Sequence, residues 1–306
     1  MTNKTVAPTS SKVNGSSAFT DISGSRKAVN TIASVIIYLC MLIALIPLVW
    51  VLWELIVKGL PVTLRAEWWT EDMLGTMYHS KGGGALHAIT GTFIQTLIAS
   101  VVAIPIGVFT AIYLVEYSTG GWLGRITTFM VDILSGVPSI VAALFVYAAW
   151  ITTMGFDRSG MAVAWSLLLL MIPVVVRNTE EMLRVVPMDL REASLALGVP
   201  KWKTIAKIVL PTALSGIVTG IMLAIARIMG ESAPVLILVG STSALNTNPM
   251  DGPMSSLPLM MLDMYKAGVT ENVLDKMWGA AFTLVLLIAL LNIGARIISA
   301  KYSVKK

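Results

Sequence analysis

Six apolar stretches of this chain each run for 18 or more residues without a single Asp, Glu, Lys or Arg. They occupy residues 28–53, 82–115, 133–156, 159–176, 208–226 and 277–295. A helix needs about 20 apolar residues, within a range of about 17–25, to cross a bilayer. Charged residues make up only 13% of the chain, against roughly 25% in soluble domains, and are too few to cover a water-exposed surface. The pattern predicts an all-α integral membrane protein with six spanning helices.

Two of the apolar regions need comment. The third spanning helix is expected to begin near Ile126 and to form one span. A seventh apolar piece, Ala233–Gly240, is only eight residues long and contains Pro234. It is too short to span, so it is interpreted either as a re-entrant segment or as a broken extension of the fifth helix.

The distribution of Lys and Arg predicts the topology. With the N-terminus inside, cytoplasmic segments hold 15 of the 22 basic residues and external loops hold six. Cytoplasmic loops are enriched in basic residues, so both termini are expected in the cytoplasm and the chain in the cell (cytoplasmic) membrane. The same excess of basic residues in cytoplasmic segments explains the net charge of +5, so no nucleic-acid partner is expected. The expected environment of the spans is membrane lipid.

The predicted domain organisation follows from these spans. Residues 1–27, rich in Ser, Thr, Asn and Gly, are expected to form a disordered cytoplasmic tail. A first transmembrane helix over 28–57 and an external loop over 58–86 come next. Residues 87–300 are expected to form the main membrane domain, with 301–306 as a second cytoplasmic tail.

The cytoplasmic loop between the fourth and fifth spans contains the sequence PMDLREASLALGVP, residues 187–200. Asp189 followed by Glu192 resembles a capping box, and Gly198 with Pro200 provides a helix stop. These signals predict a helix within residues 189–198. Such a short helix is unstable alone in water and needs a surface to rest on. The small residues Ala193 and Ser194 would let a partner approach closely, although an incidental amphipathic helix is the simpler alternative.

Glu192-Ala193-Ser194, then Gly198 and Ile208-Val209-Leu210-Pro211, resembles the EAA loop of ABC-importer permeases. Ser194 stands where that family usually has a second Ala. The resemblance implies that this loop is the coupling helix, which sits in a groove of a cytoplasmic ATPase. It also implies a type-1 importer (MetI-like) core of five helices, here with an additional N-terminal helix.

The stretches LSGVPSIVAALF (134–145), GGGALHAITGT (82–92), ARIMGESAP (226–234) and SLPLMMLDMYKAG (256–268) resemble the PstA-type phosphate permeases. The resemblance is strong from about residue 85 to the C-terminus and weaker over the first span. It implies a permease subunit of an ATP-driven importer of inorganic phosphate. The implied partners are a PstC-like second permease, two PstB-like ATPases and an external PstS-like phosphate-binding protein.

Arg227 and Glu231 are four residues apart, and they share a helix face if the helix continues through Gly230. Ionisable groups within spans are costly and suggest function. By resemblance, Arg227 matches the arginine that the PstA type is thought to use in its phosphate path. Two structural alternatives remain open: an ion pair at a kink, and a side chain that reaches the outer interface.

The triplet Gly82-Gly83-Gly84 precedes the second span and is either an anion-binding outer mouth at a helix start or a flexible linker. The chain lacks a phosphate-binding loop of the form GxxxxGK[ST], so ATP hydrolysis is expected on other subunits and this chain is not expected to be an enzyme. One Cys and two His are too few for a convincing metal centre, and no metal or cofactor is expected.

Three alternatives stay open at this point. One is a permease for another oxyanion, such as molybdate or tungstate. A self-sufficient secondary carrier would need internal repeats with paired broken helices, which the sequence does not contain. A membrane-embedded hydrolase would need an intramembrane Ser/His or metal set, which is also lacking.

Overall fold

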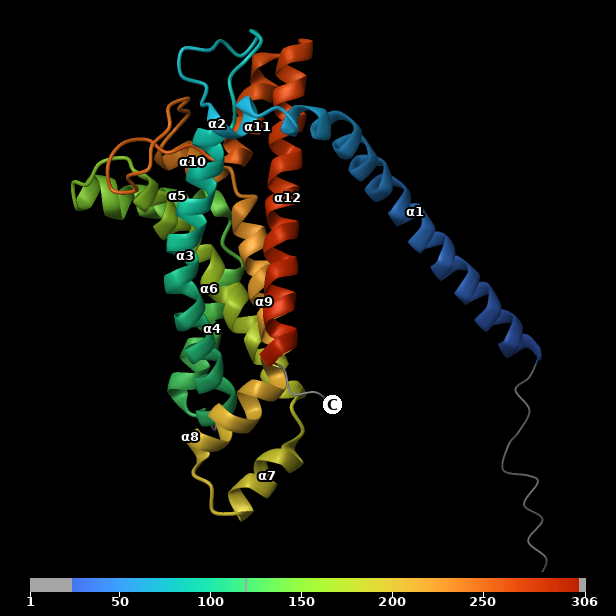
Figure 1. Ribbon diagram of the computed structural model, residues 1–306. Helices are drawn as coiled ribbons and strands as arrows, with labels where there is room; N and C mark the ends of the chain where they lie inside the picture. The colour runs from blue at the N-terminus through green and yellow to red at the C-terminus, as the bar shows by residue number, and fades with distance from the viewer. Residues whose placement is uncertain (1–23, 119, 303–306) are drawn as a thin grey trace, which may run out of the picture. The chain divides into compact units, whose positions relative to one another are not determined.

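The computed structural model describes residues 24–118 and 120–302, which form helices joined by loops, with no β-strand in these two ranges (Figure 1). The predicted all-α class is confirmed. In chain order the elements are α1 (Gly24–Thr63), α2 (Glu67–Thr70), α3 (Leu86–Ile112), η1 (Tyr113–Tyr117), α4 (Trp122–Ser135), α5 (Ser139–Val146), η2 (Tyr147–Thr153), α6 (Gly160–Val185), α7 (Met188–Ala196), α8 (Lys201–Thr204), η3 (Ile205–Val209), α9 (Leu210–Met229), α10 (Ala233–Leu238), α11 (Leu257–Ala267) and α12 (Glu271–Tyr302). The three η elements are π-helical turns.

The chain divides into two units, residues 1–53 and residues 54–306. The helix α1 is longer than the expected 28–57, so the segment expected as an external loop, 58–86, begins with the last turns of α1 and contains α2. Most of the expected tail 1–27 and the end of the tail 301–306 lie outside the described residues.

Within the described residues, five helical segments are long and apolar enough to cross a membrane: α1, α3 with η1, α6, α9 with its preceding turns, and α12. The third predicted span is a bent pair, in which Trp122–Ser135 and Ser139–Thr153 meet at 105°, and it is a sixth span if the pair crosses the membrane together. It is therefore not one straight helix from near Ile126. The break falls at Gly136–Pro138 because proline has no N–H to donate and restricts the residue before it to extended backbone.

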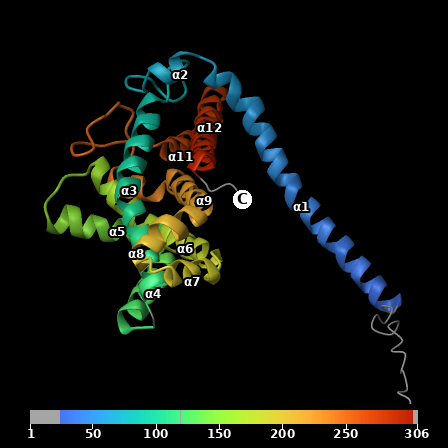
Figure 2. The same cartoon turned by 60° about the horizontal axis from the view of Figure 1, so that its bottom comes forward.

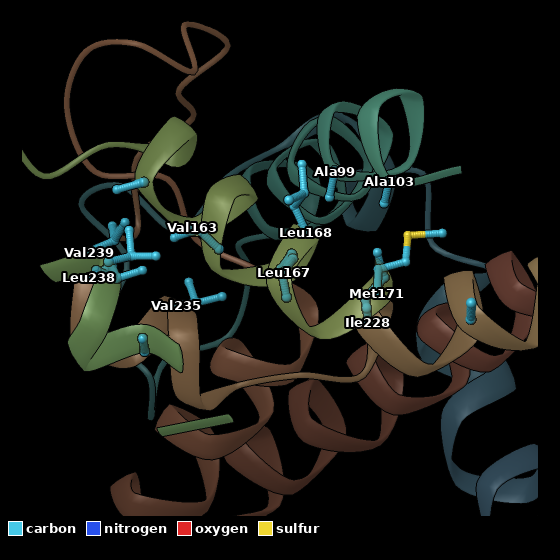
Figure 3. Packing of buried hydrophobic residues seen from close by; sticks show 14 of the residues in the cluster. Ala99, Ala103, Val163, Leu167, Leu168, Met171, Ile228, Val235, Leu238 and Val239 are labelled. Carbon is cyan, nitrogen blue, oxygen red and sulfur yellow. The ribbon is translucent and has the colours of Figure 1, made fainter. Parts of the chain in front are cut away.

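A core of small and branched side chains joins α3, α5, α6, α9 and α10. Ala99 and Ala103 of α3 lie beside Leu168 and Met171 of α6, and Ile228 of α9 packs next to Met171 (Figure 3). Small residues at helix interfaces let membrane helices approach closely. The helices α3, α6 and α9 accordingly lie side by side in both views of the molecule (Figures 1 and 2).

Glycine marks the closest approaches within this bundle. A Cβ at Gly107 of α3 would lie 2.6 Å from the Val175 side chain of α6, and one at Gly91 would lie 2.0 Å from the Ser255 carbonyl oxygen. Thus α3 is fixed to α6 in its lower half and to the loop before α11 in its upper half. In the second unit, α7 and α8 lie at the end opposite α2 and α11 (Figure 1).

Ala233–Gly240 contains a separate short helix, α10, and is not a continuous extension of α9. Pro234 occupies the first turn of α10 and cannot donate to a preceding turn. The buried side chains of Val235 and Leu238 pack into the same core as Ala143 of α5. This packing holds the end of α9 in place.

Candidate functional site

The predicted coupling helix is α7, and its N-terminus differs from the expected arrangement. The helix begins after Pro187, and no side chain accepts a hydrogen bond from its first turn. The capping box expected from Asp189 and Glu192 is therefore not formed. Asp189 still lies in the first turn, where the helix dipole favours a carboxylate.

The predicted stop of α7 is found at Gly198. Its φ of +76° lies in the left-handed region, which favours glycine. The Gly198 N–H donates to the Leu195 carbonyl at 2.9 Å, and the Val199 N–H donates to the Ser194 carbonyl at 3.2 Å. These two bonds satisfy carbonyls that would otherwise be orphaned at the helix end.

Ser194 faces into the protein and not toward a partner. Its side chain is buried, and its Oγ lies 2.8 Å from the Oγ1 of Thr204 on α8. Glu192 and Ala193 are exposed on the other side of the helix. Apolar side chains are exposed at the same end of the molecule, notably Leu197 (83%) and Trp202 (64%). The loop thus presents a small, partly apolar surface beside a carboxylate.

An ion pair that sequence reasoning missed anchors α7 to the end of the second span. Arg191 donates from Nε and Nη2 to Glu116 Oε1 of η1, at 3.0 and 2.9 Å. It also donates to the carbonyl oxygens of Val186 and Leu183 at 2.6 and 2.8 Å. The side chains are only 12% and 6% exposed, so both charges are buried and partnered.

Arg227 and Glu231 lie near the end of α9 that is distant from α7. The helix ends at Met229, so the condition for a shared face, continuation through Gly230, is not met. Arg227 is exposed and Glu231 is half-buried. Within residues 24–118 and 120–302, neither side chain forms an ion pair or a hydrogen bond. A structural ion pair between them is therefore not present.

Arg227 continues a stripe of exposed residues along α9. Thr212, Ser215, Thr219 and Leu223 precede it at intervals of three or four residues and are also exposed. This spacing places them on one face of the helix. Thr212 and Thr219 donate their hydroxyls to carbonyls four residues earlier in the same helix, at 2.6 and 2.8 Å. The unpaired guanidinium of Arg227 is therefore the group on this face that is costly against lipid. From the sequence, only Arg227 was predicted as a site residue on this face, although the spacing of the three hydroxyl residues is also visible there.

The structure argues against an anion site built from the N–H groups of the glycine triplet. The Gly84 N–H donates to the Asp72 carbonyl at 3.1 Å, and a Cβ at Gly84 would lie 2.3 Å from the Glu67 carbonyl oxygen. Gly84 is therefore surrounded by acceptors, which repel anions. Gly82 and Gly83 have φ of +91° and +77° and line a cavity of about 420 Å³.

This cavity carries a balanced set of charges. Its lining contains three cationic and three anionic side chains: Arg65, Lys81, Lys276, Glu67, Glu271 and Asp275. The buried Lys276 ammonium donates to the carbonyls of Met77, Tyr78 and Ser80 at 3.4, 3.3 and 3.0 Å. The lysine thereby ties the loop before α3 to α12.

Asp72 joins two loops at the same end of the bundle. Its Oδ2 accepts from the Leu245 N–H and its Oδ1 accepts from the Leu74 N–H, each at 3.0 Å. These backbone donors, that of Leu245 first, hold the pKa of the Asp72 carboxyl below its ordinary value. Hydrogen bonds to a carboxylate favour its charged form.

A second ionic cluster ties α4 to α6 at the end nearer α7. Arg177 pairs with Asp132 of α4 and donates to Glu180 at 2.9 Å. Glu180 also accepts from Arg184 at 2.6 Å, so its carboxylate is partnered within its own helix. Sequence analysis assigned no role to Asp132, because only the fold brings it to a residue 45 positions later.

Comparison with known proteins identifies the family. Residues 103–304 match the family described as binding-protein-dependent transport system inner membrane component. The chain is 50% identical over 273 residues to the phosphate transport system permease protein PstA 1 of Mycobacterium tuberculosis, covering 89% of this chain and 88% of that protein. It is 40% identical to PstA of Yersinia pestis over 90% of this chain and 92% of that protein. The chain belongs to the PstA family.

Solved structures support the fold of this PstA-family chain. A methionine ABC transporter, MetNI, in an inward-facing conformation superposes with a TM-score of 0.56 at 21% identity, covering 72% of this chain and 95% of that chain. A bacterial alginate ABC transporter gives a TM-score of 0.53 at 15% identity over 85% of this chain and 94% of that chain. The expected ABC-importer permease architecture is confirmed.

Proposed function

We propose that this PstA-family chain is one half of the membrane passage of an importer for inorganic phosphate. The observation that carries the proposal is the 50% identity, over nearly the full length of both chains, to a phosphate transport permease. The chain lies in the cytoplasmic membrane with both termini inside, in accordance with its basic cytoplasmic segments. Its partners are a PstC-like permease, two PstB-like ATPases and a PstS-like binding protein outside.

The coupling surface in this proposal is α7. Glu192 and Ala193 face outward and meet the ATPase, whereas Ser194 and Gly198 shape the helix from within and at its end. ATP hydrolysis takes place on the partner subunits, since the chain has no phosphate-binding loop of its own. This chain supplies the path and the mechanical link and is not an enzyme.

Arg227 is the anion-attracting group of the path. Its unpaired guanidinium stands on the exposed stripe of α9 and offers a planar fork to phosphate oxygens. At 1.5 Å per residue it lies about 30 Å along the helix from Lys207, close to the external end. The stripe therefore leads from the external end toward the cytoplasm, with hydroxyl groups at Thr219 and Ser215 below the arginine.

Glu231 contributes selectivity in this proposal. Phosphate at neutral pH carries a proton and sulfate does not, so a carboxylate can accept a hydrogen bond from phosphate and only repels sulfate. Such an element favours one ligand and penalises the other. Glu231 lies just past the end of α9 and has no partner in the described parts of the chain, so its carboxylate is available.

The test is reconstitution of the permease pair with its ATPases in liposomes, with and without this chain. ATP-dependent phosphate uptake should require the chain, and Arg227→Gln should abolish most of it. Arg158→Gln is the matched control, because it removes the same charge from the segment before α6. Uptake of molybdate in place of phosphate would contradict the substrate, and full uptake by Arg227→Gln would contradict the path.

Selectivity is measured on the permease pair freed of its binding protein. Glu231→Gln should raise sulfate flux relative to phosphate flux, whereas Arg227→Gln should lower both. An unchanged ratio in Glu231→Gln would refute the role of the carboxylate.

A further inference from the structure

The ion pair between Glu116 and Arg191 links two segments that lie 75 residues apart in sequence. Glu116 sits in η1, the π-helical turn that ends the second span. Arg191 sits in the middle of α7 and holds Glu116 Oε1 with two donors. Charge-assisted bonds of this kind are about twice as strong as neutral ones. The pair is thus a strong direct connection between α7 and the helix α3.

The surroundings of Glu116 fix the position of η1 from a second side. Lys201, at the start of α8, donates from Nζ to the Glu116 carbonyl oxygen. The same ammonium lies 5.1 Å from the centre of the Tyr117 ring. Arg191 of α7 and Lys201 at the start of α8 therefore both bind the same π-helical turn, η1. Such turns recur at functional sites within helices.

The helix α7 also contacts α8 and η3, the turns that lead from its loop into α9. Ser194 bonds Thr204, ten residues later, and Arg191 bonds the carbonyls of Leu183 and Val186 at the end of α6. These contacts hold the shape of the loop. Among the described residues, Glu116 is the hydrogen-bond partner that takes Arg191 beyond its own loop and the preceding turn of α6.

Motion at η1 would pass directly into α3. That helix packs on α6 without space for a side chain at Gly107, and on the Ser255 carbonyl without space at Gly91. Packed interfaces of this density shift as rigid bodies and do not deform continuously. A displacement of α7 at one end would therefore reach the loop before α11 at the other end.

We infer that Arg191 and Glu116 are positioning residues that transmit movement of α7 to α3, and thereby join ATP hydrolysis to opening of the path. The inference rests on the proposed function, in which α7 docks on the ATPase. It concerns the efficiency of energy transfer and not the binding of phosphate. Neither side chain touches the substrate.

Glu116→Gln is the selective test, because Arg191 keeps its two carbonyl acceptors and the loop keeps its shape. In the complete reconstituted importer we expect the ratio of binding-protein-stimulated to basal ATPase activity to fall by about fivefold or more, the lower end of typical coupling between sites. Phosphate carried per ATP hydrolysed should fall in parallel. Glu116→Ala, which removes the acceptor altogether, should give the larger loss.

Glu180→Gln is the matched control. Its carboxylate is 7% exposed, against 6% for Glu116, and it is paired with two arginines of its own helix. A merely structural pair would change the yield or thermal stability of the assembly in all three variants and leave phosphate per ATP unchanged. We expect only the two Glu116 variants to change that ratio.

Unchanged phosphate per ATP in assembled Glu116→Gln and Glu116→Ala complexes would overturn the inference. Failure of both variants to assemble would overturn it too, because the pair would then be a folding element. If the wild-type complex hydrolyses ATP in response to its binding protein without carrying phosphate, the proposed substrate is wrong. In that case the ATPase ratio still tests the ion pair.

Discussion

Replacement of Gly198 by Val tests the backbone contribution to the loop that contains α7. A Cβ at this position meets no atom within 4 Å, so the first carbon of the side chain has room. Its cost comes from φ of +76°, which an L-residue with a branched side chain adopts at about 1–2 kcal/mol. If the backbone relaxes instead, the two hydrogen bonds that close α7 are lost, at about 1 kcal/mol each.

Either route shifts a nine-residue helix that is only marginally stable. A loss of about 1.4 kcal/mol changes the helix population about tenfold. Hydrogen exchange of the α7 amides, measured by mass spectrometry in the assembled complex, should therefore accelerate by about this factor, and phosphate uptake should fall. Gly198→Asn is the control, because asparagine tolerates the left-handed region. Equal exchange and equal uptake in the two variants would refute the backbone argument.

Three further predictions concern the rest of the molecule. The lowered pKa of Asp72 stabilises the folded state at pH values above the ordinary Asp pKa of about 4. This stabilisation is lost as the pH falls through the lower pKa of the folded state. Asp72→Asn should therefore make the unfolding temperature in detergent depend less on pH in that range. Gly91→Ala forces a Cβ to 2.0 Å from a carbonyl oxygen and should lower the unfolding temperature far more than Gly198→Ala, measured in the same assay. With Cys40 replaced, a cysteine at 158 should react with an impermeant thiol reagent in intact cells and one at 192 should not; the reverse pattern would overturn the topology.

The all-α class and five of the six predicted spans followed from charge spacing and composition. Long uncharged runs identify spans because an unpaired charge in lipid is expensive wherever it falls. Pro138 indicates a kink in the third region, but the 105° angle of the break does not follow from the sequence. The composition of a segment shows that it is apolar but does not give the direction of its helix axis. The direction here depends on packing of α5 against α10, which is a tertiary contact.

The site shows the same division between local and distant information. Gly198 was identified correctly because a left-handed helix stop is a local property with a glycine signature. The interaction between Glu116 and Arg191 could not be identified, since no short-range pattern connects residues 75 positions apart. The predicted capping box of Asp189 and Glu192 is not formed, for a related reason. A spacing of three residues permits such a box, but Pro187 sets the backbone before the helix and no side chain closes it.

In the proposed function, the exposed stripe of α9 faces the second permease. Thr212, Ser215, Thr219 and Arg227 share one face of a spanning helix, and that face is open within the described chain. The hydroxyls of Thr212 and Thr219 donate to carbonyls of their own helix, whereas the Arg227 guanidinium has no partner in the described chain and lipid cannot provide one. In the proposed function, this face is one wall of a passage whose other wall is the second permease. The ion pair at η1 lies at the opposite end of the same bundle from Arg227. In the proposed function, the energy input and the anion entry are therefore separated by the length of the spans.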